Sequence, residues 1–489
     1  MPSVPARRGS QDVTLGGGRP DAIYIGREAL PGWRGGKKVT YGGPLHHFLV
    51  GPNGVGKGMR MLAPNLLTME GKSIVVVDPK GQLATMTANF RRHVSDVKII
   101  DPFGVVNELA QEQPSVFAPL IEAGLVESVG FNPLASLVPD SDLFYDDAAV
   151  VADALIKIQG NDPHWSESAQ GLVTGLVMWE REQYGDQANL EHIRFLLTEA
   201  DRYEPVPGSR KMRQVAGLAV TAERMATEGS FEVASLAGKF SADHTTDEIE
   251  SVKSTAETQT RWLLSRPLRR DLKKSGVEFS QLKTGDRPMT VYIVIPSERA
   301  EDHSIWLRLL VSDALRACMT AGGRRVLFML DEFAALGHLS IIQKLFGVVR
   351  DYRVQLMPVL QSLEQLSKIY PDRWNTMLGS AGVLQSFRAN DPFTADYFSK
   401  RSPPRTVTAL GYNQGSGQSQ GGANSNSGMS YNQMEKPMIL PHQMLDMPDD
   451  QAIAYFMGSS NPAIFVMPHL KQMELQRSRM LDNPYYRND

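Results

Sequence analysis

The chain has 489 residues, with 51 Lys and Arg against 54 Asp and Glu, so its formal net charge is −3 at pH 7. This length predicts several domains, each large enough to bury a core, and the single cysteine, Cys318, excludes internal disulfides and cysteine-rich zinc sites. No apolar run approaches the roughly 18–20 residues of a membrane-spanning helix, and residues 1–8 lack the apolar core of a signal peptide. We therefore expect a soluble chain. Its near-neutral charge argues against a DNA-coating protein but leaves room for basic residues that line a channel.

The first 139 residues show two different patterns. Residues 1–43 are rich in Gly and Arg, so we expect an irregular lead-in with one short strand at 22–25. In residues 44–139, short apolar runs alternate with turn residues, which is typical of strands buried on both faces of a parallel sheet. The expected elements are strands at 48–50, 73–77 and 97–100 and a crossover helix at 59–69. This order predicts the first part of an α/β domain.

Strand signals vanish between residues 140 and 250, where apolar residues recur at helical spacing. We expect an inserted all-α domain there, and a second part of the α/β domain in residues 251–489. The strands expected in this second part are 289–295, 326–330, 354–360, 382–387, 452–456 and 463–466. Of the 24 residues from 411 to 434, 19 are Gly, Ser, Asn or Gln and none is charged. Because such a segment cannot offset its ordering entropy by burial, a flexible loop is predicted there.

The strongest local motif is a glycine-rich loop between a predicted strand and a predicted helix. It consists of Gly51, Pro52, Asn53, Gly54, Val55, Gly56, Lys57 and Gly58. Glycines let backbone N–H groups converge on a phosphate, and Lys57 can reach the β- and γ-phosphate oxygens, so the motif predicts ATP as the ligand. Gly58 stands where such loops usually carry a Ser or Thr that ligates Mg²⁺. The ion would then depend on a distant carboxylate and on water. The structural alternative is a chance glycine-rich turn.

A second motif consists of two carboxylates, Asp331 and Glu332, at the end of the predicted strand 326–330. A nucleotide hydrolase needs such a pair, and we assign Asp331 to the Mg²⁺ shell and Glu332 to the attacking water. A strand that ends in Asp-Glu is common by itself, so the assignment depends on its partnership with Lys57. The two motifs lie further apart in sequence than a minimal nucleotide-binding core requires. The predicted insert accounts for most of the excess.

Two further residues fit the same chemistry. Gln361 follows the predicted strand 354–360 and should lie beside Asp331 at the carboxyl edge of the sheet, where it can sense the γ-phosphate or the water. Arg350 lies in a helical segment before that strand and is a candidate arginine finger for a neighbouring subunit's nucleotide. A solvated surface arginine is the alternative for Arg350, and Arg353 is a rival for the role.

Several motifs together carry a family resemblance. They are the glycine-rich loop, Asp78-Pro79-Lys80-Gly81, Asp331-Glu332-Phe333-Ala334-Ala335-Leu336-Gly337 and Leu360-Gln361-Ser362. From about Tyr24 to Val466 the chain resembles the TraG/VirD-type coupling proteins of type IV secretion. The resemblance implies a RecA-like P-loop ATPase core with a mainly parallel central sheet, an inserted all-α domain, and ATP and Mg²⁺ as cofactors. It gives Lys57, Asp331, Glu332, Gln361 and Arg350 the same roles as the chemistry does.

The family resemblance also implies an assembly and partners. These are a homo-oligomer, typically a hexamer, at the cytoplasmic face of the bacterial inner membrane; relaxase-bound single-stranded DNA or effector proteins; and membrane-embedded secretion components. Most members begin with two membrane-spanning helices, which this sequence lacks, so we expect either the cytosolic part of a longer protein or a soluble variant. The alternatives are an FtsK-like DNA translocase, a secretion-assembly ATPase and, from another class, a nucleotide-gated docking platform with little hydrolysis.

Other polar features have ordinary explanations beside functional ones. The most basic stretch, residues 261–274, is a candidate for DNA contact or a solvated helix face. His164 and Trp165 open a predicted helix of the insert and are candidates for a substrate surface, with core or capping use as the alternative. His46, His47 and His338 show no metal-ligand spacing, so no metal other than nucleotide-bound Mg²⁺ is expected.

Overall fold

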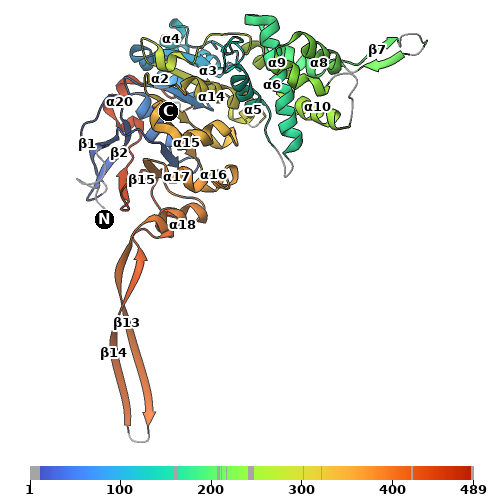
Figure 1. Cartoon of the computed structure of the whole chain (residues 1–489). Coiled ribbons are helices and arrows are strands. Elements are labelled where there is room, and N and C mark those ends of the chain that lie inside the picture. Colours follow the sequence, from blue (N-terminus) through green and yellow to red (C-terminus); the bar gives the residue numbers. More distant parts are fainter. Residues whose placement is uncertain are drawn as a thin grey trace.

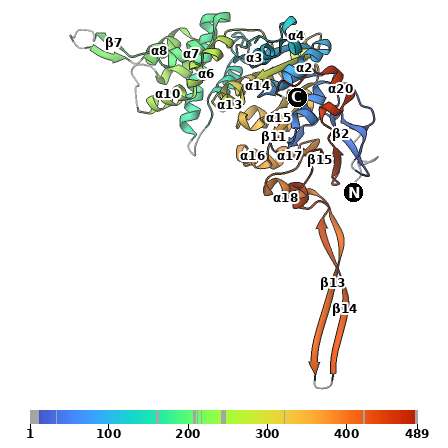
Figure 2. The same cartoon turned by 180° about the vertical axis from the view of Figure 1, so that it is seen from behind.

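The computed structural model describes residues 12–485, except for 33, 159–162, 206–209, 211, 216, 241–246, 301, 321 and 420–421. A helical region and a long two-stranded hairpin project in different directions from an α/β core (Figure 1). The view from behind shows the same two projections (Figure 2).

In the described part of the chain, twelve strands form one central sheet, and seven neighbouring strands of it pair in parallel. In spatial order the seven are β6 (Asp96–Ile100), β9 (Met289–Val294), β5 (Ser73–Asp78), β10 (Val326–Leu330), β11 (Val354–Leu360), β4 (His47–Val50) and β12 (Val383–Ser386). Each lies within one residue of a strand predicted from a short apolar run. The mainly parallel α/β sheet is therefore confirmed.

The other five strands extend the sheet in antiparallel pairs. In order from β12 they are β15 (Gln451–Phe456), β16 (Ala463–Val466), β2 (Ile23–Leu30), β3 (Arg34–Tyr41) and β1 (Val13–Leu15). The predicted irregular lead-in is therefore wrong for residues 13–41, which supply three strands instead of one. The register of β2 against β3 shifts twice, and Gly26, Gly35 and Gly36 interrupt the pattern, so these strands show no clear apolar period.

Helices cover both faces of the sheet, so its central strands are buried on both sides. Along β5, Ile74 and Val76 belong to one buried cluster, whereas Val75 and Val77 belong to the other. The first cluster also contains residues of the turn η1 (Gly58–Leu62) and of α1 (Ala63–Leu66), α2 (Gln82–Val94), α3 (Val105–Glu112) and α4 (Pro114–Glu122). The second contains residues of α14 (Ser304–Cys318), α15 (Ser340–Tyr352), α16 (Leu363–Ile369) and α17 (Trp374–Gly379).

The projecting helical region corresponds to the predicted insert. Its helices are α5 (Phe144–Leu155), α6 (His164–Tyr184), α7 (Leu190–Leu197), α8 (Gly217–Glu228), α9 (Phe231–Ala237) and α10 (Asp247–Gln259). Two details differ from the expectation of an all-α domain ending at residue 250. A short hairpin, β7 (Arg202–Pro205) and β8 (Met212–Val215), extends from its far end (Figure 1), and residue 250 lies inside α10.

The long hairpin replaces the loop predicted at residues 411–434. Strand β13 (Pro404–Ser419) pairs with β14 (Gly422–Pro437) in one antiparallel register from Pro404↔Pro437 to Ser419↔Gly422. The prediction considered only the side chains, which offer little to bury. A two-stranded ladder pairs the inward-facing backbone N–H and C=O groups whatever the side chains are, and water can satisfy the outward-facing ones, so an uncharged polar sequence is compatible with it.

The remaining described elements are short. They are α11 (Arg266–Asp271), α12 (Gln281–Thr284), α13 (Ser297–Ala300), α18 (Pro392–Arg401), α19 (Pro441–Leu445), α20 (Glu474–Arg479) and the turns η2 (Gly185–Gln187), η3 (Gly238–Phe240), η5 (Arg261–Leu264), η6 (Phe333–Leu336) and η7 (Leu470–Gln472). Among the described residues, no helix combines the length and the apolar character needed to traverse a bilayer.

Candidate active site

Four adjacent parallel strands bring the predicted residues to one edge of the sheet. The glycine-rich loop follows β4, Gln361 follows β11, Asp331 and Glu332 follow β10, and Asp78 ends β5. Because the carboxyl ends of parallel strands share an edge, these segments meet there. Open α/β sheets bind their ligands at this edge. They line one cleft of about 1040 Å³.

The glycine-rich loop has the backbone shape that its glycines permit. Gly54 and Gly56 adopt φ of +87° and +83°, a left-handed conformation that other residues rarely adopt. Lys57 folds back over the loop, where its Nζ donates to the carbonyl oxygens of Gly51 (2.6 Å) and Pro52 (3.0 Å). Burial lowers the pKa of Lys57, while the nearby carboxylates of Asp331 and Glu332 oppose that shift. The loop thus holds a cation inside a concave backbone.

Two carboxyl groups line the same cleft: Asp78, at the end of β5, is buried, and Asp331, after β10, is partly buried. Burial raises the pKa of Asp331 to about 6; Lys57 opposes the shift and Glu332 reinforces it. Burial likewise raises the pKa of Asp78 to about 7, although its Oδ2 accepts a hydrogen bond from the backbone N–H of Ala84 (2.8 Å) in the first turn of α2. A bound cation at this position would favour the charged form of both groups.

Glu332 has an unusual backbone conformation. Its φ is +69°, in the left-handed region that non-glycine residues seldom occupy, and such strain is common at functional sites. Gln361 donates from Nε2 to Oε1 of Glu332 (3.3 Å), and its own backbone N–H donates to Oε1 of Gln365 (2.9 Å). The glutamine predicted to lie beside Asp331 therefore contacts the neighbouring carboxylate directly.

Arg350 lies in the last turn of α15, and its side chain lies outside the described residues. Helix α15 leads into the amino end of β11, so the backbone of Arg350 is near the edge of the sheet opposite the cleft. Arg353, the rival candidate, is at that same far edge and donates from Nη1 to the carbonyl of Gly323 (3.1 Å). Neither position suits a role in the cleft of the same subunit.

Some residues that line the cleft were not predicted. Lys80 belongs to the motif of residues 78–81, and Gln365 lies shortly after Gln361. These motifs could therefore have indicated that both residues line the cleft. Lys157 follows α5 and Ser304 begins α14. Neither residue belongs to a sequence motif that predicts a ligand site. In the structure the Nζ of Lys157 donates to Oγ of Ser304 (2.6 Å). Only the tertiary fold reveals that the helical insert reaches the cleft.

The other polar candidates have structural contacts. In the basic stretch, both Arg269 and Lys273 pair with Glu191 of α7, so part of its charge is neutralised within the chain. His47 is buried against Gln385, with Nε2 and Oε1 3.0 Å apart. Among the described residues, no group of three or more His, Cys, Asp or Glu could hold a metal ion.

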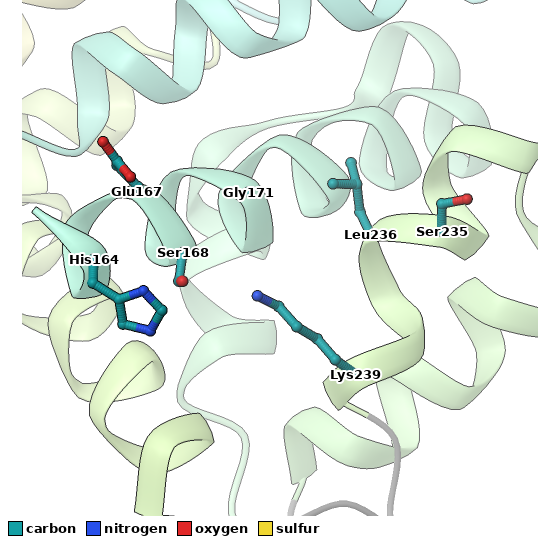
Figure 3. A pocket seen from close by; sticks show the side chains of 7 residues that line it. All are labelled: His164, Glu167, Ser168, Gly171, Ser235, Leu236 and Lys239. Atoms are coloured by element: carbon teal, nitrogen blue, oxygen red, sulfur yellow. The ribbon is translucent and has the colours of Figure 1, made fainter.

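His164 lines a smaller hollow of about 410 Å³ in the helical insert. Its side chain, Ser168 and Lys239 approach a common space between α6 and the segment after α9 (Figure 3). Nε2 of His164 also lies 3.3 Å from Oε1 of Glu248, and its ring packs edge-on against the partly exposed Trp165. Both residues therefore lie on the surface of the insert.

The sequence matches the family described as "Type IV secretory system Conjugative DNA transfer" over residues 11–111 and 123–465. The chain belongs to this family. It is 24% identical over 470 residues to the conjugal transfer protein TraG of Escherichia coli, covering 91% of this chain and 68% of that protein. It is 26% identical over 428 residues to the type IV secretion system-coupling protein VirD4 of Bartonella quintana, covering 85% and 61%. The chain thus spans about three fifths to two thirds of these relatives.

Solved structures of the plasmid coupling protein TrwB have the same fold. The complex with the GTP analogue GDPNP matches with a TM-score of 0.60 at 16% identity, covering 95% of this chain and 98% of that one. The complex with ADP and Mg²⁺ matches with a TM-score of 0.59 at 15% identity, covering 87% and 86%. The family resemblance and the RecA-like α/β fold predicted from the motifs are therefore confirmed.

Proposed function

We propose that this chain is the motor part of a type IV coupling protein and that its cleft binds and hydrolyses ATP with Mg²⁺. The observation that carries the proposal is the convergence of Lys57, Asp331, Glu332 and Gln361 on one cleft at the carboxyl edge of the sheet. TrwB, which shares this fold, has been solved with ADP and Mg²⁺ and with non-hydrolysable ATP and GTP analogues.

The residues of the cleft fit a magnesium nucleotide. The loop carbonyls that now accept from Lys57 are weaker acceptors than phosphate oxygens, so the ammonium can turn to a β- or γ-phosphate. Gly58 has no hydroxyl to ligate Mg²⁺, so Asp331 would supply the nearby protein oxygen and water would complete the shell. Mg²⁺, when bound, neutralises the phosphate oxygens.

The remaining residues would act on the water. Glu332 accepts a hydrogen bond from Gln361 in the same cleft, so its carboxylate can orient a water molecule and accept its proton. Gln361 links this group to α16 through Gln365, which makes it the residue that would report the nucleotide state to the following elements.

The wider role follows from the family. We propose that residues 140–250 act as an inserted domain between the two parts of the ATPase, residues 44–139 and 251–489. We also propose that the chain forms a hexamer at the inner membrane. There it would deliver relaxase-bound single-stranded DNA or effector proteins to membrane-embedded secretion components. The family's description as conjugative DNA transfer and the names of the relatives support this role.

The decisive variant is Lys57→Ala. It removes the cation that contacts the phosphates, so ATP turnover should fall by at least about 10²-fold, as when one preorganised electrostatic donor is lost. The measurement is steady-state phosphate release with and without single-stranded DNA, together with the melting temperature as a check on folding. Lys344→Ala, an exposed lysine outside the cleft, is the matched control and should retain turnover. Normal turnover in Lys57→Ala would show that the site assignment is wrong.

A further inference from the structure

Arg308 is a buried arginine that the catalytic scheme does not use. It lies on α14 with 2% of its surface exposed. Its guanidinium donates to two segments that are far apart in sequence. One segment is the end of α5, the first helix of the insert. The other is the loop of residues 332–338, here called the Glu332 loop.

The four hydrogen bonds of Arg308 divide evenly between these segments. Nε donates to the carbonyl of Ala154 (3.1 Å) and Nη2 to that of Asp153 (2.9 Å). Nη1 donates to the carbonyls of Leu336 (2.9 Å) and His338 (2.5 Å). Four of the five N–H groups of one guanidinium are thus occupied by backbone oxygens.

The acceptors explain why a charge is stable in this buried place. Asp153 and Ala154 belong to the last turn of α5, where carbonyls lack partners within the helix and carry the negative end of its dipole. The carbonyl of Leu336 likewise ends η6. Removing a cation from water costs several kcal/mol unless its donors are satisfied, and here the ends of two helical segments satisfy them. The arrangement is stable only while both ends stay in place.

The end of α5 is also fixed to the last helix of the insert. The backbone N–H of Lys157 donates to Oε1 of Gln259 (2.6 Å), and Nε2 of Gln259 donates back to the carbonyl of Lys157 (2.9 Å). Because Gln259 ends α10, the first and last helices of the insert are joined at its base. A displacement at the end of α5 would therefore move the base of the insert as a unit.

We propose that Arg308 is a positioning residue that transmits the nucleotide state of the Glu332 loop to the inserted helices. The inference rests on the proposed function, since it requires nucleotide in the cleft. Glu332, with its strained backbone, begins the loop whose carbonyls Arg308 binds. When the loop adjusts to nucleotide, its carbonyls move the guanidinium, and the guanidinium moves the end of α5.

The test compares Arg308→Met with Arg316→Met by hydrogen–deuterium exchange. Arg316, two turns along the same helix, also joins α14 to α5, through Asp147 (2.9 Å). Its other contacts are with Asp313 and Ser136, which lie outside the Glu332 loop. Each variant of the 489-residue chain is measured with and without a non-hydrolysable ATP analogue and Mg²⁺. In the unmodified chain the analogue should slow exchange in residues 51–58 and also change it in residues 150–157.

Arg308→Met should keep the response in residues 51–58 and lose the response in 150–157, whereas Arg316→Met should keep both. The kcat of Arg308→Met should fall with little change in its nucleotide Kd. Arg308→Lys can donate to fewer carbonyls, so its response in 150–157 should be intermediate, and this variant decides the matter if Arg308→Met does not fold.

A full response in the Arg308 variants, or an equal loss in Arg316→Met, would overturn the inference. Without protection of residues 51–58 in the unmodified chain the proposed function fails, whereas protection there but no response in 150–157 refutes the inference alone.

Discussion

At Asp331, function and stability oppose each other. Its pKa is raised from 3.8 to about 6, so the folded chain holds this proton more tightly than the unfolded chain. The stability that the neutral carboxyl contributes is complete below about pH 4 and is lost as the pH rises through about 6. At neutral pH the protein therefore keeps a charge in a place that disfavours it, and a bound magnesium nucleotide would relieve that cost.

Asp331→Asn should separate the two effects. An asparagine mimics the protonated carboxyl, so the free energy of unfolding should rise at pH 8 by on the order of 1–3 kcal/mol and should be nearly unchanged at pH 4. Magnesium-dependent turnover should be lost at both pH values. Denaturant titrations at the two pH values measure the first effect, with the exposed Asp372→Asn as a control. A variant no more stable than its parent at pH 8 would contradict this account.

The residues of the cleft differ in how far the sequence could predict them. Lys57 and Asp331 stand in local patterns, a glycine-rich loop and a strand end, and each pattern implies its own chemistry. The sequence predicted that Gln361 lies beside Asp331, because consecutive parallel strands end at the same edge of the sheet. The hydrogen bond from Gln361 to Glu332 is seen only in the structure. Lys157 and Arg308 could not be predicted, because their roles depend on how α5 packs against α14 and the core.

Among the elements, the start of η1, directly after the glycine-rich loop, allows a direct test of the Mg²⁺ site by substitution. A Cβ added at Gly58 would meet no atom within 4 Å, so a larger residue fits there. Gly58→Ser places a hydroxyl where related loops ligate Mg²⁺, and it should lower the Mg²⁺ concentration needed for half-maximal nucleotide binding severalfold. Stability should stay equal or rise by about 0.5 kcal/mol, since glycine is a poor helix former.

Gly58→Ala is the matched control, because it offers the same helix propensity benefit without the hydroxyl. Titration of Mg²⁺ at a fixed concentration of a fluorescent nucleotide compares the three proteins. An equal effect of alanine and serine would show that the gain comes from the helix and not from the metal shell.

The strands also differ in whether the sequence could predict them. The parallel strands could be predicted because burial on both faces produces uninterrupted apolar runs, as in β10. Strands β2 and β3 lie near the edge of the sheet and shift register, so their side chains carry no such pattern. In the hairpin of β13 and β14 the hydrogen bonds are made by the backbone, which no count of polar residues can indicate.

For the whole molecule, the position of Arg350 predicts a shared active site. Helix α15 carries its backbone away from the cleft of its own subunit, so a catalytic role requires a neighbouring subunit. Arg350→Ala and Glu332→Ala should each be inactive alone, whereas an equal mixture should regain activity. In a ring with one kind of head-to-tail interface, about a quarter of the interfaces would combine an intact arginine with an intact glutamate.

Phosphate release from the reassembled mixture measures this rescue. The control mixes Lys57→Ala with Glu332→Ala, whose two defects lie in the cleft of one subunit. Intact residues from one subunit cannot repair the other in that mixture, so it should stay inactive. Activity in the control, or its absence in the Arg350 mixture, would contradict an arginine supplied in trans.

The long hairpin affects how the size of this molecule can be measured. At ~3.3 Å per residue, a strand of 16 residues extends about 50 Å, more than twice the radius of gyration of about 23 Å expected for a compact chain of 489 residues. Such a ribbon adds frictional drag with little mass, so one copy of 54.0 kDa diffuses like a larger particle. Elution volume alone would therefore overstate its oligomeric state, whereas light scattering, which responds to mass, would distinguish an elongated monomer from a ring.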